Sequence, residues 1–275
     1  MSIKNMVCQI SNKILVNNNF NYIKDVYEVC INRYRQYPFK LSSIDRGKKI
    51  LTSEKEVDTY ISLFGAHHYY KLIEAFDALN LNKFNNTYIE TISYGCGAAT
   101  DTCGLISYCY TKNISLSVNK ITLIEPSTIA LRRGVKYIKQ SLPYRVVSQL
   151  NIRSIYKLIG QLEEKDITSN SKAIKLHIFS NILDIDSINL QNIASLINTT
   201  QKGSNYFICL GPNYFKSKNK INYFYKILSN YFKLTDIDVN DRSIVGKPIW
   251  KIIDNRYTDN IPISRYHRIF KADTI

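Results

Sequence analysis

Residues 88–101 read YIETISYGCGAATD and combine an apolar strand, a tight turn and the start of a helix. β-Branched and aromatic residues fill the strand side, and Thr100 and Asp101 suit the first turn of a helix. Gly95 and Gly97 allow the backbone to turn sharply and to approach a ligand closely. Free N–H groups at the start of the helix favour a polar or anionic group there. The stretch therefore predicts a ligand-binding junction.

A second apolar strand, with the sequence ITLI at residues 121–124, ends at an acidic residue. Glu125 and Pro126 follow it directly and precede a helix expected over residues 128–141. Glycines after one strand and an acid after the next are typical of a doubly wound, nucleotide-binding α/β sheet, whose ligands lie at the carboxyl ends of the strands. A carboxylate at this position can bind the hydroxyls of a ribose.

These two strands, each followed by a helix, resemble the class I, Rossmann-like S-adenosylmethionine-dependent methyltransferases. The resemblance extends over residues 87–275. In that superfamily the glycine turn holds the amino-acid end of the cofactor, and the acid after the second strand bonds the ribose hydroxyls. The resemblance implies S-adenosylmethionine as the cofactor. The cofactor-binding residues that it implies are Tyr94, Gly95, Cys96, Gly97, Ala98, Glu125 and Pro126, with Asn181 near the reacting end.

The chain departs from the family pattern at two positions. Ser93 stands where the family often has an acidic residue, and Ala99 replaces a common third glycine. The departures keep a second hypothesis open: a catalytically inactive methyltransferase-like domain that binds cofactor, nucleotide or a macromolecular partner.

The expected architecture is a Rossmann-like methyltransferase sheet with a terminal β-hairpin and an N-terminal helical cap. We expect the cap over residues 1–86 and the S-adenosylmethionine-binding domain over residues 87–275. The remaining segments are assigned as a third strand within residues 143–150, a helix from residue 151, a strand over residues 173–179, a strand over residues 206–210, and a hairpin of residues 232–239 and 249–253 that residues 261–271 could extend.

The helical stripe that follows Ser53 carries two of the four histidines. Ser53 and Glu56 form a capping box, which predicts the helix start. Helical geometry places His68 on the apolar face and His67 on the flank with Lys71. His68 is either a satisfied core residue or, if the helix covers the cofactor cleft, a side chain offered to the substrate. Adjacent histidines on a helix diverge, so a metal site is not expected.

Polar residues follow the strand over residues 173–179. The resemblance implies that this strand end faces the transferable methyl group and the substrate. Asn181 could hold an amine or hydroxyl of the acceptor, and Asp184 could act as a base, although Asp184 and Asp186 could equally be charges at a helix start. The predicted catalytic residues are Asn181, Asp184 and His68, which could converge with Tyr69 on the methyl group.

The overall composition leaves the methyl acceptor open. The formal net charge of +15 is spread along the chain without a basic arm, so it favours either a nucleic-acid surface or a compositional bias toward lysine. RNA and other nucleic acids therefore stay among the candidate acceptors and partners. The six cysteines include no C-x-x-C pair, which predicts reduced thiols and no zinc site. The absence of a long apolar run or a secretory segment predicts a cytoplasmic protein.

Overall fold

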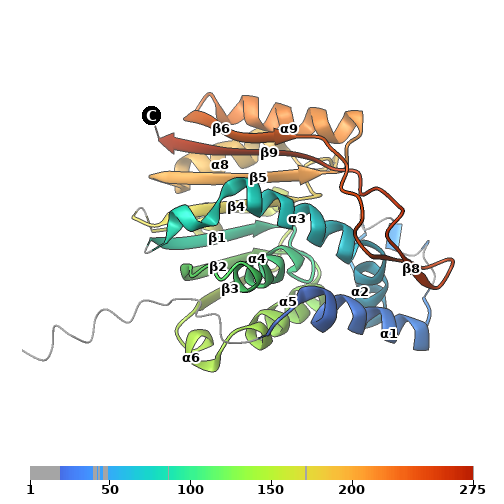
Figure 1. Cartoon of the computed structure of the whole chain (residues 1–275). Coiled ribbons are helices and arrows are strands. Elements are labelled where there is room, and N and C mark those ends of the chain that lie inside the picture. The colour runs from blue at the N-terminus through green and yellow to red at the C-terminus, as the bar shows by residue number, and fades with distance from the viewer. Residues whose placement is uncertain are drawn as a thin grey trace, which may run out of the picture.

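A computed structural model of the protein describes residues 19–39, 42, 44–45, 49–85, 87–170 and 172–274. These residues form an α/β structure with a central sheet (Figure 1). Within these ranges no helix is both long and apolar enough to cross a bilayer. The described cysteines are buried and unpaired, and Cys8 lies outside the described residues.

The central sheet contains seven strands. They are β1 (Tyr88–Tyr94), β2 (Ser117–Ile124), β3 (Asn151–Ile155), β4 (Ile174–Ser180), β5 (Ser204–Gly211), β6 (Phe232–Asn240) and β9 (Tyr266–Thr274). Their order across the sheet is β3-β2-β1-β4-β5-β9-β6. Strands β1 to β5 pair in parallel, whereas β9 pairs antiparallel with both β5 and β6. The parallel strands therefore end at one edge, which is where ligands bind in such sheets.

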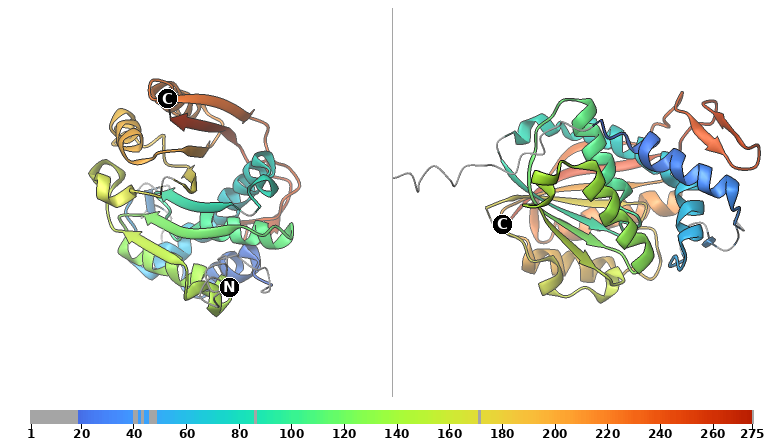
Figure 2. Two further views of the ribbon diagram at one scale, coloured as in Figure 1. Left: turned by 90° about the vertical axis from the view of Figure 1, so that its left-hand side faces the viewer. Right: turned by 90° about the horizontal axis from the view of Figure 1, so that it is seen from below.

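Helices cover both faces of the sheet (Figure 2). One face is packed by α3 (Ala66–Leu79), α4 (Thr100–Thr111) and α5 (Thr128–Ser141), and the other by α8 (Leu190–Thr200) and α9 (Phe215–Leu228). Short helical segments complete the connections: η6 (Leu81–Phe84), α6 (Tyr144–Val147), η7 (Ile159–Gln161) and α7 (Glu164–Ile167). Parallel strands require such crossover helices, because each connection must return across the sheet.

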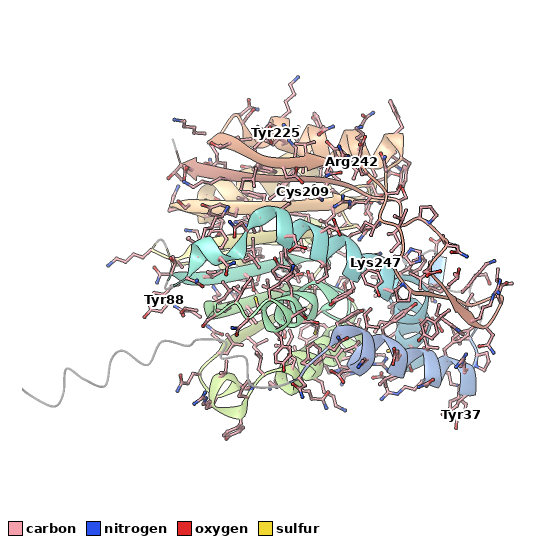
Figure 3. The ribbon with its side chains drawn as sticks, in the orientation of Figure 1. Tyr37, Tyr88, Cys209, Tyr225, Arg242 and Lys247 are labelled. Carbon is pink, nitrogen blue, oxygen red and sulfur yellow. The ribbon has the colours of Figure 1, made fainter. Side chains whose placement is uncertain are left out.

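The N-terminal helices lie at the edge where the parallel strands end. They are η3 (Ile23–Tyr27), α1 (Glu28–Gln36), α2 (Glu54–Tyr60) and the π-helical η5 (Ile61–Gly65), which leads into α3. In Figure 3, Tyr37 beyond the end of α1 and Tyr88 at the start of β1 lie at opposite ends of the molecule. The predicted capping box is confirmed, since the Ser53 hydroxyl accepts the N–H of Glu56 and the Glu56 carboxylate accepts the N–H of Ser53.

A small hairpin near the C-terminus packs on these helices. Its strands are β7 (Ile249–Lys251) and β8 (Arg256–Thr258). The backbone N–H of Trp250 donates to the Tyr27 hydroxyl at 2.9 Å, and the Tyr34 ring meets the Trp250 ring edge-on at 5.7 Å. Residues from both ends of the chain thus support the edge that carries the glycine turn.

Two strand predictions are wrong. Residues 144–147 form the helix α6 after Pro143, and the third strand is β3, which was expected to be a helix. β3 is an edge strand with mostly half-exposed residues, so it lacks the apolar run that marks a buried strand. The antiparallel pair at the end of the chain is present, but β6 pairs with β9, whereas residues 249–251 pair with β8.

The core on the α8–α9 face contains a buried histidine with a predictable effect on stability. The His177 ring stacks on Phe207 at 4.4 Å, and its Nδ1 accepts the Tyr94 hydroxyl at 3.1 Å while Nε2–H donates to Asn205 Oδ1 at 3.2 Å. Burial lowers the pKa of His177 to about 3. In the unfolded chain this imidazole binds a proton near pH 6.5, whereas in the folded protein it stays neutral at that pH. Folding stability therefore falls as the pH drops below about 6.5.

On acidification from about pH 7 to about pH 5, we expect the free energy of unfolding to fall by about 2 kcal/mol because of His177. Urea unfolding of the wild type and of His177→Phe at both pH values measures this. The phenylalanine keeps the stacked ring and removes the titrating group, so the loss of stability on acidification should be about 2 kcal/mol smaller in the variant. Equal losses in the two proteins would contradict the assignment.

Candidate functional site

The turn between β1 and α4 places Gly95, Gly97 and Ala99 in the left-handed region, with φ of +66°, +55° and +59°. Glycine adopts this conformation readily. A Cβ at Gly95 would also lie 2.6 Å from Cδ1 of Ile182. At Gly97 the nearest atom to such a Cβ is Cε1 of Tyr60, at 4.0 Å. The backbone at Gly97 therefore borders a space that a ligand can approach.

The two departures from the family pattern have local structural explanations. Ala99 takes the left-handed conformation that a glycine would take. The Ser93 hydroxyl donates a hydrogen bond to the carboxylate of Asp101 in the first turn of α4. Burial raises the pKa of Asp101 to about 6, although the hydrogen bonds from Ser93 and the Thr102 N–H act to lower it. A carboxyl group thus lies beside the end of β1 even though Ser93 itself is uncharged.

Glu125 connects the end of β2 to the glycine turn. Its Oε2 accepts the N–H of Gly97 at 3.0 Å, and its Oε1 accepts the N–H of Ser127 at 2.9 Å. Burial raises the pKa of this carboxyl, while the two N–H groups act to lower it. Each carboxylate oxygen has two acceptor sites, so both can take a further donor. Glu125 can therefore bind two adjacent hydroxyls, as a ribose presents them.

A cavity of about 210 Å³ opens beside Glu125, and we call it the Glu125 cavity. Its walls are mainly aliphatic and come from the loops after β2, β3 and β4, which suits a flat, weakly polar ring. The other lining residues are Lys49, Ile50, Gly95, Pro126, Leu158, Ile159, Gly160, Gln161, Ile182, Ile185, Ser187 and Ile188.

A second pocket of about 330 Å³ lies next to the first, and we call it the His68 pocket. It forms where α2, η5 and α3 meet the loops after β4 and β5. Its lining residues are Tyr60, Phe64, His67, His68, Lys71, Asn181, Asp184, Ile185, Pro212 and Tyr214. Ile185 lines both the His68 pocket and the Glu125 cavity, so the two spaces share a wall.

The histidines of the His68 pocket are neutral near pH 7. Burial lowers the pKa of His67 to about 4, and the nearby Lys71 ammonium adds to this effect. The pKa of His68 is also well below its usual value, for the same reasons. The Nδ1 of His68 lies 3.5 Å from the Tyr60 hydroxyl. These rings can therefore form hydrogen bonds without adding positive charge.

The polar groups on the opposite wall are held by specific partners. Asn181 has φ of +57°, and its Oδ1 accepts from Nζ of Lys71 at 3.0 Å. The Asp184 carboxylate accepts a hydrogen bond from the Tyr214 hydroxyl. The loop after β4 is thereby connected to α3 on one side and to the start of α9 on the other.

The structure brings together most, but not all, of the side chains predicted to form the site. His68, Asn181 and Asp184 line the His68 pocket, and Gly95, Glu125 and Pro126 line the Glu125 cavity.

Tyr69 is not part of the His68 pocket, because its ring stacks on Tyr22 and its hydroxyl bonds Ser107. The side chains of Tyr94, Cys96 and Ala98 are buried.

Sequence reasoning missed two parts of the site. Lys71 was expected on the helix flank with His67, but it is also three residues after His68, and the structure places it in the same pocket. The segment 158–161 follows β3 and lines the Glu125 cavity, but the third strand was expected elsewhere in the chain. Among the described residues, no three His, Cys, Asp or Glu side chains are placed to hold a metal ion.

The strand order decides the fold. Five parallel strands lie in the order β3-β2-β1-β4-β5, and the final antiparallel strand β9 is inserted between β5 and β6, with the glycine turn after β1 and the acid after β2. This chain has a Rossmann-like methyltransferase fold.

Comparison with family models and with curated protein sequences finds no match. Solved structures similar to this methyltransferase fold include the plantazolicin methyltransferase BpumL in complex with SAH, which is 10% identical, with a TM-score of 0.46 over 91% of this chain and 96% of that chain. The YcgJ protein from Bacillus subtilis is 8% identical, with a TM-score of 0.45 over 72% and 99%.

The N-methyltransferase NodS from Bradyrhizobium japonicum WM9, in complex with S-adenosyl-L-homocysteine, is 10% identical, with a TM-score of 0.42 over 72% of this chain and 85% of that chain. The assignment of the methyltransferase fold rests on the strand order, not on these values.

Proposed function

We propose that the protein is an S-adenosylmethionine-dependent methyltransferase, with the adenine and ribose of the methyl donor in the Glu125 cavity and the acceptor in the His68 pocket. The observation that carries the proposal is the shared wall at Ile185 between these two spaces. One space has Gly95 of the glycine turn and a carboxylate suited to ribose, and the other has neutral imidazoles, an amide and a lysine.

The residues of the Glu125 cavity fit the donor in chemical character. The backbone at Gly95 and Gly97 suits the amino-acid end, Glu125 suits the ribose hydroxyls, and aliphatic side chains such as Ile159 and Ile182 suit the adenine ring. When bound, S-adenosylmethionine supplies a methyl group on a positively charged sulfur. The complexes of BpumL with SAH and of NodS with S-adenosyl-L-homocysteine support this choice of cofactor.

The protein's own contribution is to hold the acceptor in position. Asn181 lines the His68 pocket from the end of β4, where its amide can bind a hydroxyl or amine of the acceptor. Tyr60 lies over Gly97 and also lines the His68 pocket, so its ring can keep water from the space between the two sites. Alignment of this kind accounts for a large share of the catalysis expected of such an enzyme.

The proposal is tested by measuring binding and transfer separately. Isothermal titration calorimetry with S-adenosylmethionine and its demethylated product should show binding. Incubation with radiolabelled S-adenosylmethionine and fractionated cell extract should place label in one of the RNA, DNA, protein or small-molecule fractions. RNA and DNA are included because the chain carries a net charge of +15. Absence of cofactor binding would contradict the proposal, and binding without transfer to any fraction would favour the inactive alternative.

Asn181→Gly should lower methyl transfer at least about tenfold while changing cofactor affinity by less than about threefold, because the lost amide positions the acceptor and not the donor. Glycine is the chosen replacement because Asn181 has a left-handed backbone. The matched control is Asn113→Gly, which removes another left-handed asparagine, φ +53°, from the α4–β2 connection. Equal transfer rates in the two variants would remove Asn181 from the acceptor site.

A further inference from the structure

Lys71 is a buried lysine without a carboxylate partner. Its side chain extends from α3 into the His68 pocket, and the residue is only 5% exposed. Nζ donates a hydrogen bond to Oδ1 of Asn181 at 3.0 Å, and within the described part of the chain Lys71 forms no ion pair. An ammonium group has three N–H donors, so the charged form has two more donors than this acceptor satisfies.

Burial of an unpaired charge is unfavourable, so burial favours the neutral form of Lys71. Desolvation lowers the pKa of Lys71 to about 8, although the negative charge of Asp184 acts to raise it. A substantial fraction of the side chain is then a neutral amine at mildly alkaline pH. Such an amine can take a proton, whereas most lysines near neutral pH cannot.

The other polar side chains that face the pocket are less suited to take the proton. On the same helix, His67 and His68 have pKa values far below neutrality and hold a proton weakly. The Asp184 carboxylate is already hydrogen-bonded by the Tyr214 hydroxyl. The pKa of Tyr60 is raised by burial, so its hydroxyl stays protonated. Lys71 is therefore the group whose basicity matches general-base catalysis.

The pocket walls indicate the shape of the acceptor. The rings of Phe64 and His68 are nearly parallel, with centroids 6.0 Å apart, and the Tyr60 ring lies 5.9 Å from His68. Aromatic walls favour a planar ring that can stack on them or meet them edge-on. The volume of about 330 Å³ lies at the lower end of the range for small-molecule sites. A single small ring system thus suits the pocket.

We propose, building on the methyltransferase function proposed above, that the acceptor is a small aromatic molecule with an acidic hydroxyl group and that Lys71 is its general base. The hydroxyl oxygen forms the new bond to the methyl carbon, and the bond from that carbon to the donor sulfur breaks. The hydroxyl proton passes to Nζ of Lys71. The products are a methyl ether, the neutral thioether and a Lys71 ammonium that later releases its proton to water.

The proton transfer is tested first without methyl transfer, with 4-nitrophenol as the probe, because its ionised form absorbs visible light. At a pH just below the pKa of the free phenol, binding to the wild type should increase the ionised fraction. Lys71→Met should abolish the increase, since methionine keeps a similar apolar stem and cannot accept a proton. The matched control is Lys83→Met: burial also lowers the pKa of Lys83, but Lys83 lines neither site. No binding, or equal ionisation in all three proteins, would overturn the proposal.

Methyl transfer to 4-methylphenol then provides the second test, because the pKa of this phenol is close to that of tyrosine, about 10, and its hydroxyl stays protonated where Lys71 titrates. The wild-type rate should rise with pH and level off above about pH 8, because the neutral amine is the active form. Lys71→Met should be slower by about 100-fold or more, and its rate should not level off near pH 8. Lys71→Arg should behave in the same way, because arginine stays protonated. A Lys71→Met protein that shows the wild-type rate and the wild-type pH dependence would overturn the proposal.

Calorimetry separates the two proposals. Lys71→Met should bind the cofactor with an affinity within about threefold of the wild-type value. Lys71 lines the His68 pocket and not the Glu125 cavity. Failure of the wild type to bind S-adenosylmethionine would instead contradict the methyltransferase function itself.

Discussion

Gly134→Ala is expected to weaken S-adenosylmethionine binding by at least about tenfold and to destabilise the fold by about 1–3 kcal/mol. A Cβ at Gly134 would lie 2.9 Å from the carbonyl carbon of Ala98 and 3.0 Å from the nitrogen of Ala99. The third close atom is Cβ of Ala99, also at 2.9 Å, and neither backbone atoms nor a Cβ can rotate away. Helix α5 or the turn must therefore move.

The turn has little freedom to move away from α5. The N–H groups of Gly95 and Cys96 both donate to the Ile124 carbonyl, at 2.9 and 3.0 Å, and Gly97 is bonded to Glu125. Displacement of the turn would break these contacts and change the surface offered to the cofactor.

Gly104→Ala provides a matched control, because it is the same substitution in the neighbouring helix α4. Its Cβ would meet only ordinary contacts, the nearest being Cδ2 of Tyr69 at 3.6 Å. We expect it to keep cofactor affinity and to stabilise the protein by up to about 1 kcal/mol, since alanine favours helix more than glycine. Urea unfolding and calorimetry on both variants make the comparison. A stable Gly134→Ala protein with wild-type affinity would show that the close approach is unimportant.

The second large effect is expected at Glu125. Glu125→Ala should weaken S-adenosylmethionine binding by about 1–3 kcal/mol, because a charged acceptor for the ribose hydroxyls is lost. The same change removes the acceptor for the N–H groups of Gly97 and Ser127, so part of the loss will come from a less ordered turn. Glu164→Ala, an exposed acid that lines neither the Glu125 cavity nor the His68 pocket, is the control.

A double comparison isolates the contribution of the ribose. Adenosine and 2′-deoxyadenosine are titrated into the wild type and into Glu125→Gln. The wild type should prefer adenosine, and the variant should show a much smaller preference, because the carboxylate that accepts the second hydroxyl is gone. An unchanged preference in Glu125→Gln would place the ribose elsewhere, even if overall affinity fell.

The elements that sequence analysis placed correctly have strong local signals. The capping box at Ser53 and Glu56, the glycines after β1 and the amphipathic period of α5 each involve residues within a few positions of one another. Helix α5 spans Thr128–Ser141, as expected. Patterns of this kind depend on backbone geometry and on one apolar face, so they survive in many tertiary contexts.

The elements that it placed wrongly have weak or competing local signals. β3 is an edge strand whose polar residues are mostly half-exposed. The adjacent valines of α6 resemble a strand more closely than β3 does. The segments 232–239 and 249–253 both look like strands, and local pattern cannot choose which partner each one takes. In the folded protein β9 lies between β5 and β6 and pairs antiparallel with both strands.

The sequence by itself therefore determined the strand–turn–helix junction, the acid after β2 and the α/β class, because glycine conformation and hydrophobic periodicity act over short distances along the chain. Only the tertiary structure decided which side chains face one another. Lys71 meets Asn181 across 110 residues of sequence, and Ile185 comes to separate two pockets. The free energy of these contacts comes from burying surfaces of distant elements together, and no local pattern records that burial.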